Sequence, residues 1–216
     1  MNVNKIIFMN YLKQVCFLLM ATLVIGCSDD DDGVSGPPTT GDEITYELFE
    51  RSDSGVSGTA KIEELDDGTS KLTLNLNGTP DDGMHPSHIH ANTAVEGGDI
   101  IISLNEVDGS TGVSETIISE DDAGDIVTYQ DLLDIDAYIN VHLSADDLAT
   151  VVAQGDIGQN VLTGENKTYT LGEKDVEGIN GSVLFEERKN GEALATISLD
   201  GTPDDGVHPS HIHANT

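Results

Sequence analysis

The sequence predicts an all-β fold, an antiparallel β-sandwich built from tandem modules. Many short segments alternate apolar and polar residues, and turns rich in Gly and Asp separate them. One stretch of sixteen residues occurs twice, at 78–93 and 201–216, with a single difference, Met84 against Val207, which indicates an internal repeat. The chain has no Trp and only 4% aromatic residues, so its core must consist mainly of Leu, Ile, Val and Ala.

Residues 1–26 are predicted to be a lipoprotein signal peptide and not part of the fold. Lys5 and Lys13 supply positive charge, and the apolar run 15–25 is too short to span a bilayer comfortably. The run ends in Val-Ile-Gly before Cys27, which resembles a bacterial lipobox. We therefore expect cleavage before Cys27 and lipidation of this residue, which would tether the protein to a membrane; the alternative is an uncleaved signal anchor.

Residues 27–43 are predicted to be an acidic, flexible linker. Four consecutive aspartates, 29–32, are typical of a solvated linker whose charges repel one another. The run also resembles the acidic tag that some Gram-negative lineages place after the lipidated cysteine of surface lipoproteins. The expected location is the cell envelope, on a lipid-anchored and surface-exposed outer-membrane protein.

A first module is expected at 44–163, and it opens a series of alternating segments. Asp66-Asp67-Gly68 has the residues of a hairpin turn between two of them. One helical turn is expected at 129–133, and a short helix is expected to begin at a Ser144 N-cap and to end at Gly155. The expected strands are Ile44–Glu50, Gly58–Leu65, Lys71–Asn77, Ser87–Ala91, Asp99–Leu104, Ser114–Ser119, Ala137–His142 and Asp156–Gln159.

A second module is expected at 167–216, offset from the first by 123 residues. The match extends upstream of the repeated stretch and needs no gap: Thr45-Tyr46, for example, corresponds to Thr168-Tyr169. The second copy has no counterpart of 94–163, and half a module would leave strand edges unpaired. We expect the sequence to be a fragment of a longer tandem array; the alternative is a natural truncation.

Charge and cysteine content exclude several classes of protein. The formal net charge is −31, with 40 acidic residues against 9 basic ones. Nucleic-acid binding needs a basic face, and docking on an anionic membrane through charge is equally disfavoured. After cleavage only Cys27 would remain, so no intrachain disulfide is expected.

Histidine is concentrated in the repeated stretch, which contains six of the seven histidines of the chain. In an extended strand His88 and His90 share one face about 7 Å apart at Cα, while Ile89 faces the core. Two imidazoles at that spacing can bind one ion. Isolated His-x-His pairs are usually ordinary surface histidines, but the duplication, with His142 inside the repeat period, favours a metal site.

The segments of the first module resemble the CHRD domain, a family first named in chordin and common in bacterial envelope proteins. The resemblance rests on the His-Ile-His strand 88–90, Gly97–Leu104, Tyr138–His142 and Gly155–Gln159, in this order and spacing. It covers nearly all of 44–163, and its first half fits again at 167–216. The family often has an arginine in the last element, and this sequence lacks it.

CHRD domains are similar in architecture to copper/zinc superoxide dismutase, so the resemblance implies a Greek-key β-sandwich. The enzyme's Gly-x-His-x-x-His-x-His pattern occurs at 83–90, and its Val-His-x-x-x-Asp-Asp-Leu pattern occurs at 141–148. The resemblance therefore implies copper (or zinc) ligands and supporting histidines at the following positions: His88, His90 and His142 as ligands with His85 in support, and His211 and His213 with His208 in the second copy.

The sequence also departs from the enzyme. No histidine lies between His90 and His142, so the bridging ligand and the zinc histidines are absent, as are the disulfide cysteines. The only arginines are Arg51 and Arg188, neither at the position of the enzyme's substrate-guiding arginine. The net negative charge would also repel an anionic substrate.

These observations favour a non-enzymatic binding or adhesion module, displayed in tandem on a lipid anchor and carrying a metal site. Its partner would be a protein or a glycan that the sequence does not name. Repetition raises avidity, whereas catalysis gains little from it. The alternatives are a copper-only dismutase-like enzyme or copper carrier, and a purely structural spacer.

Overall fold

The structure is a computed structural model that describes residues 36–214. The expected signal peptide, Cys27 and the aspartate run lie outside the described residues. Within 36–214, no helix is both long and apolar enough to cross a membrane. The described residues belong to one structural unit.

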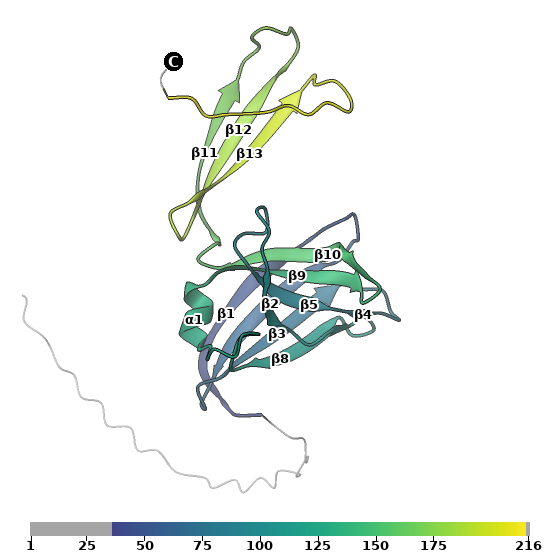
Figure 1. Cartoon of the computed structure of the whole chain (residues 1–216), viewed down its shortest axis with the longest axis vertical. Helices are drawn as coiled ribbons and strands as arrows, with labels where there is room; N and C mark the ends of the chain where they lie inside the picture. The colour runs from purple at the N-terminus through teal and green to yellow at the C-terminus, as the bar shows by residue number, and fades with distance from the viewer. Residues whose placement is uncertain (1–35, 215–216) are drawn as a thin grey trace, which may run out of the picture. The chain divides into compact units, whose positions relative to one another are not determined.

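The first repeat is an antiparallel β-sandwich with a single short helix (Figure 1). Most of the expected strands are present within one or two residues of their expected ends. The elements are β1 (Thr39–Glu50), β2 (Ser57–Leu65), β3 (Ser70–Asn77), β4 (Met84–His85), β5 (Ser87–Ala91), β6 (Ile100–Ser103), β7 (Val107–Asp108), β8 (Val113–Ile118), α1 (Tyr129–Asp134), β9 (Asp136–Ser144) and β10 (Asp147–Gly158).

The strand order is that of a Greek key, so the predicted fold class is confirmed. One layer has the order β8-β3-β2-β1, and the other has β10-β9-β5-β6. Strand β1 joins the two layers, because its last residues Phe49 and Glu50 pair with β10 after the rest of the strand has paired with β2. The chain passes from β3 to β5 in the opposite layer and returns at β8 beside β3.

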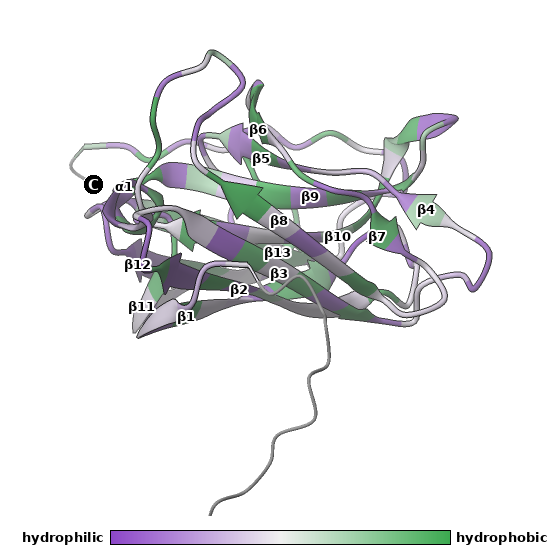
Figure 2. Cartoon of the chain, turned by 90° about the horizontal axis from the view of Figure 1, so that it is seen from below, coloured by the Kyte–Doolittle hydropathy of each residue, from purple (hydrophilic) through white to green (hydrophobic). Residues whose placement is uncertain are grey.

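The core lies between the two layers and is almost entirely aliphatic. Leu72, Leu74 and Leu76 are buried on β3, as the alternation of this strand predicts. Ile89 and Ile139 face them from β5 and β9 and are fully buried. Apolar and polar residues follow one another along the strands in Figure 2, which is the pattern of strands with one face in the core.

The short helix expected from Ser144 to Gly155 is wrong, because β10 occupies this segment. Ser144 pairs with Asp147 across a two-residue turn, and the Ser144 hydroxyl accepts a hydrogen bond from the Asp147 amide at 3.2 Å. The polar residues that resemble a helix cap therefore close a hairpin. The β-branched run Thr150-Val151-Val152 then favours a strand, which pairs along β9.

Two other expected elements need smaller changes. Strand β1 begins at Thr39, five residues before the expected start at Ile44, because Thr39 already pairs with Leu65. The expected helical turn is present as α1, and Thr128 and Asp131 form a reciprocal capping box at its N-terminus.

The second repeat forms a three-stranded sheet of β11 (Leu162–Leu171), β12 (Asn180–Arg188) and β13 (Ala193–Asp200). Adding 123 to the bounds of β2 and β3 gives those of β12 and β13. The pairing also repeats, since Leu162 opposite Arg188 corresponds to Thr39 opposite Leu65. The strand repeat therefore begins at Leu162, ahead of the expected start at 167.

Candidate metal centre

Two neighbouring strands, far apart in sequence, position three of the four histidines of the first repeat, His88, His90 and His142. Strand β5 contains His88 and His90, and it pairs with β9 so that His90 lies opposite Tyr138. The amide of His142 donates to the carbonyl of Pro86 at 2.9 Å. This bond continues the contact between the two chain segments just beyond the paired residues of β5 and β9. Because Ile89 points into the core, His88 and His90 project from the other face of the sheet, as predicted.

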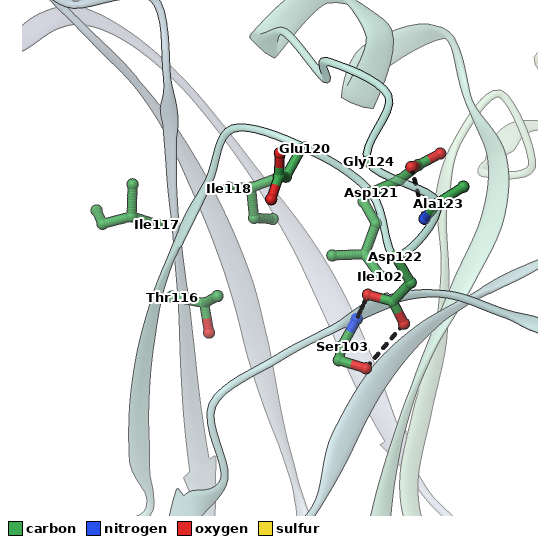
Figure 3. Close-up of a pocket in the computed structure, with 10 residues that line it drawn as sticks. All are labelled: Ile102, Ser103, Thr116, Ile117, Ile118, Glu120, Asp121, Asp122, Ala123 and Gly124. Carbon is green, nitrogen blue, oxygen red and sulfur yellow. Dashed lines mark hydrogen bonds between the residues drawn. The ribbon is translucent and has the colours of Figure 1, made fainter.

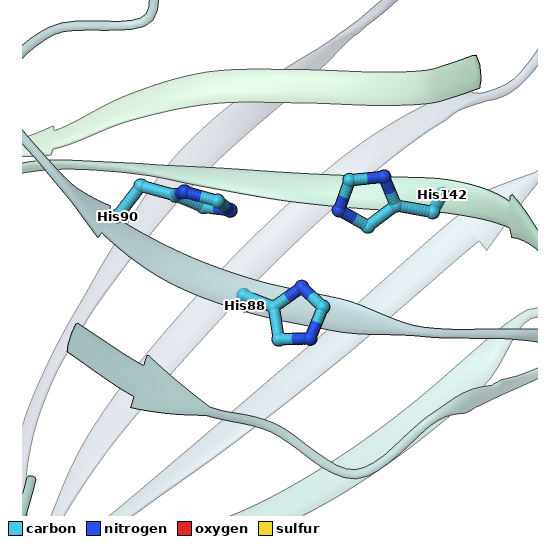
Figure 4. A group of neighbouring side chains, drawn as sticks. All are labelled: His88, His90 and His142. Atoms are coloured by element: carbon cyan, nitrogen blue, oxygen red, sulfur yellow. The ribbon is translucent and has the colours of Figure 1, made fainter. Parts of the chain in front are cut away.

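The three imidazole rings converge on one small region (Figure 4). One nitrogen from each of His88, His90 and His142 lies within 4.8 Å of the other two. The ring centroids are 5.3 Å apart for His88 and His142, 5.8 Å for His88 and His90, and 6.4 Å for His90 and His142. This buried group of three histidines can hold a metal ion.

One buried ring nitrogen of each histidine has no hydrogen-bond partner among the described residues. These atoms are Nδ1 of His88, Nε2 of His90 and Nδ1 of His142. The carbonyl of Gly98 lies 3.0 Å from Nδ1 of His90, so this nitrogen donates its proton and Nε2 carries the free lone pair. Buried polar atoms are normally satisfied, so rings that converge and each keep a buried nitrogen without a partner fit a site that takes a cation.

His85 supports the group through the backbone of β9. It is fully buried, and its Nδ1 donates to the carbonyl of His142 at 3.2 Å. Gly83 packs against the ring so closely that an added Cβ would lie 2.8 Å from Nε2. The hydrogen bond fits the supporting role that the resemblance implies for His85.

Tyr138 is a part of the site that the sequence analysis did not identify. Its ring stacks on His90 with centroids 5.0 Å apart and an angle of 18° between the planes. Its hydroxyl accepts a hydrogen bond from the Gly98 amide at 3.2 Å. The alternation of β9 places Tyr138, Asn140 and His142 on one face, and this spacing was the signal that could have identified it.

The surroundings of His88 and His142 favour their neutral forms. The pKa of His88 is lowered, first by desolvation and then by His142 and His90, while Asp122 acts in the opposite direction. Desolvation also lowers the pKa of His142, with a smaller contribution from His90 and an opposing one from the carbonyl of Leu148. Neutral imidazole is the form that binds a metal.

We expect the metal-free protein to lose stability as the pH falls below about 6.5, the usual pKa of an unfolded histidine. Because the folded pKa values of His88 and His142 are lowered, the unfolded chain takes up protons first. Their contribution is therefore complete above the unfolded pKa and is lost as the pH falls toward the folded value. Urea unfolding between pH 8 and pH 5 measures this, and a His88→Gln/His142→Gln variant should show a flatter dependence. An equally steep dependence in the variant would contradict the assignment.

The second copy of the histidine stretch is arranged differently. His208, His211 and His213 are exposed, and the rings of His211 and His213 have centroids 6.1 Å apart. The segment that contains them forms no strand up to Ala214, and no third histidine joins them in the part of the chain that the structure describes. The structure therefore brings together His88, His90 and His142 but forms no equivalent group in the second repeat.

A separate hollow of about 440 Å³ lies near the histidine strand but contains none of the three ligands (Figure 3). It lies where β6 and β8 meet the acidic turn 120–124. The carboxylate of Asp122 accepts hydrogen bonds from the amide and the hydroxyl of Ser103, and that of Asp121 accepts from the amides of Ala123 and Asp125. The Asp121 carboxylate stabilises its own turn and that of Asp122 attaches the turn to β6, so both have structural partners and the hollow is not the candidate site.

No family model matches the chain, and no curated protein matches it.

Proposed function

We propose that the first repeat is a metal-binding β-sandwich module that holds Cu(II) or Zn(II) with His88, His90 and His142. The observation that carries this proposal is the convergence of three imidazole rings from two strands, with one nitrogen of each within 4.8 Å of the other two. Nothing in the packing of the aliphatic core requires three histidines to meet at this place. A bound cation would take one nitrogen from each ring.

The ligand set favours copper or zinc over the hard cations. Neutral imidazole suits Cu and Zn, whereas Mg²⁺ and Ca²⁺ take oxygen ligands. Three protein ligands also leave a coordination position for water or for another molecule. The hydrogen bonds from His90 to Gly98 and from His85 to the backbone of His142 would fix the rings, which is the usual outer-shell arrangement of a metal site.

We further propose that the chain is a lipid-anchored envelope protein that displays CHRD modules in tandem. The lipobox ending at Cys27, the aspartate run after it and the repeated strand register support this proposal. In this setting the module binds a protein or glycan partner, and the metal stabilises or completes the binding surface. Modules on a flexible stalk gain avidity from repetition.

A copper-only dismutase-like enzyme or a copper carrier is the second candidate. The pairing of a His-Ile-His strand with His142, and the contact of His85 with the backbone of His142, favour it. The charge of the chain disfavours it, because superoxide is an anion and the net charge is −31. Arg188 could not guide the substrate, since it is buried and bonded to Asp156.

The proposal is tested by titrating residues 36–216 with Cu(II) and with Zn(II) under calorimetry. We expect one tight site per chain at pH 7.5 and a progressive loss of affinity below about pH 6.5, because protons compete for the imidazole nitrogens. Absence of binding at micromolar metal would overturn the metal centre. Superoxide consumption by the copper-loaded protein would favour the second candidate over the binding module.

A further inference from the structure

Among the described lysines and arginines, Arg188 is the one that is deeply buried, and it lies where the second repeat contacts the first. The residue is the last of β12 and is 3% exposed. Its Nη1 donates to the carboxylate of Asp156 at 2.6 Å and also to the carbonyl of Asn160. The corresponding residue of the first repeat is Leu65, a core side chain, so the arginine distinguishes this copy.

The turn that follows Arg188 adds further contacts with the first repeat. The amide of Lys189 donates to the carbonyl of Val161 at 3.0 Å, and the amide of Asn190 donates to that of Gln159 at 2.9 Å. The Asn190 side chain donates to Oδ1 of Asn160 at 3.1 Å. The β12–β13 hairpin is therefore attached to the end of β10 by backbone and side-chain bonds together.

The residues that Arg188 contacts also hold the loop that follows the histidine strand, residues 92–99. The second carboxylate oxygen of Asp156 accepts from the amide of Ala94 at 2.8 Å. Asn160 donates to the carbonyl of Asn92 at 2.7 Å, and Gln154 donates to that of Ala94 at 3.2 Å. One carboxylate thus joins the arginine of the second repeat to the backbone of this loop.

The other end of the same loop orients a candidate metal ligand. The Gly98 carbonyl accepts the Nδ1 proton of His90, and the Gly98 amide donates to the Tyr138 hydroxyl. Gly98 packs so tightly that an added Cβ would lie 2.0 Å from the carbonyl of Ala91. The loop can shift little without moving this carbonyl, which selects the ring tautomer of His90.

We propose that Arg188 is a positioning residue through which the second repeat sets the metal affinity of the first. Arg188 holds Asp156, Asp156 holds Ala94, and the loop 92–99 presents Gly98 to His90. The effect of Arg188 on metal affinity rests on the proposed function, whereas its effect on the position of the loop 92–99 does not. By reciprocity, metal at the histidine cluster strengthens the attachment of the second repeat.

Three variants of residues 36–216 test this proposal. Arg188→Leu introduces the residue that the first repeat has at this position, Arg188→Lys retains the charge, and Lys189→Leu is the control at the adjacent exposed position. The readouts are amide hydrogen exchange at Ala94 and Gly98, the His90 tautomer from nitrogen chemical shifts, and the affinity for Zn(II). Hydrogen exchange and the tautomer need no metal.

We expect Arg188→Leu to speed exchange at Ala94 and Gly98, to mix the two His90 tautomers and to weaken Zn(II) binding by about tenfold or more, the usual effect of losing an outer-shell partner. Arg188→Lys should retain part of the wild-type behaviour in each readout, and Lys189→Leu should match the wild type.

If Arg188→Leu fails to fold, Asn190→Ala replaces it as a milder loss of the same attachment. Unchanged exchange and tautomer in a folded variant would overturn the proposal. Faster exchange in a chain that never binds metal would support the loop control and overturn only the proposed function.

Discussion

Replacing His142 with alanine should abolish tight metal binding, with a loss of affinity of more than about a hundredfold. Loss of an outer-shell partner alone typically costs 10–100-fold, and a direct ligand costs more. His142 is the one ligand on β9, and without it His88 and His90 remain as a pair on a single strand. Calorimetry with Zn(II) at pH 7.5 would measure the change, and circular dichroism would confirm that the sandwich remains folded.

The chain contains its own matched control for this experiment. His211 and His213 belong to an identical His-Ile-His sequence, but they are exposed, and within residues 36–214 no third histidine joins them in a group. A His211→Ala/His213→Ala variant should therefore retain the tight site with unchanged stoichiometry. Equal losses in the two variants would show that metal binds to any His-Ile-His segment, which would contradict a centre built by β5 and β9.

The contrast between the two copies shows how far the sequence could predict the site. Alternation alone placed His88 and His90 on one face and Ile89 in the core, because strand geometry is local. The position of His142 beside them depends on the β5–β9 register, which a single sequence does not contain. The resemblance to the CHRD family supplied that link, and the convergence of the rings agrees with it.

Other features could not be predicted because they depend on tertiary contacts. The stretch after Ser144 has the residues of a helix cap, yet pairing with β9 makes it a hairpin. Strand alternation places Tyr138 on the same face as His142, but its stacking on His90 across the β5–β9 pair is visible only in three dimensions. Arg188 was identified only as an arginine away from the expected guiding position, and its burial against Asp156 is visible only in three dimensions.

Replacing Leu76 with alanine should destabilise the first repeat by about 2–5 kcal/mol, the usual cost of this substitution in a packed core. Leu76 is 3% exposed on β3, where the opposite layer of the sandwich covers it. Urea unfolding followed by circular dichroism would measure the change in the free energy of unfolding. The same variant should also weaken metal binding at 37 °C, since only the folded sandwich brings β5 and β9 together.

Leu199 is the matched control for Leu76, because it has the same residue type at the same position of the second repeat. It lies on β13 and is 37% exposed. Leu199→Ala therefore removes fewer protein contacts than Leu76→Ala and leaves a smaller cavity. We expect a loss of about 1 kcal/mol or less, the range of substitutions outside a packed core. Two equal losses would mean that the β11–β13 sheet is covered in solution as fully as the face of β1–β3. Unequal losses would show that the same strand sequence contributes to stability only where a second layer packs on it, as burial of apolar surface requires.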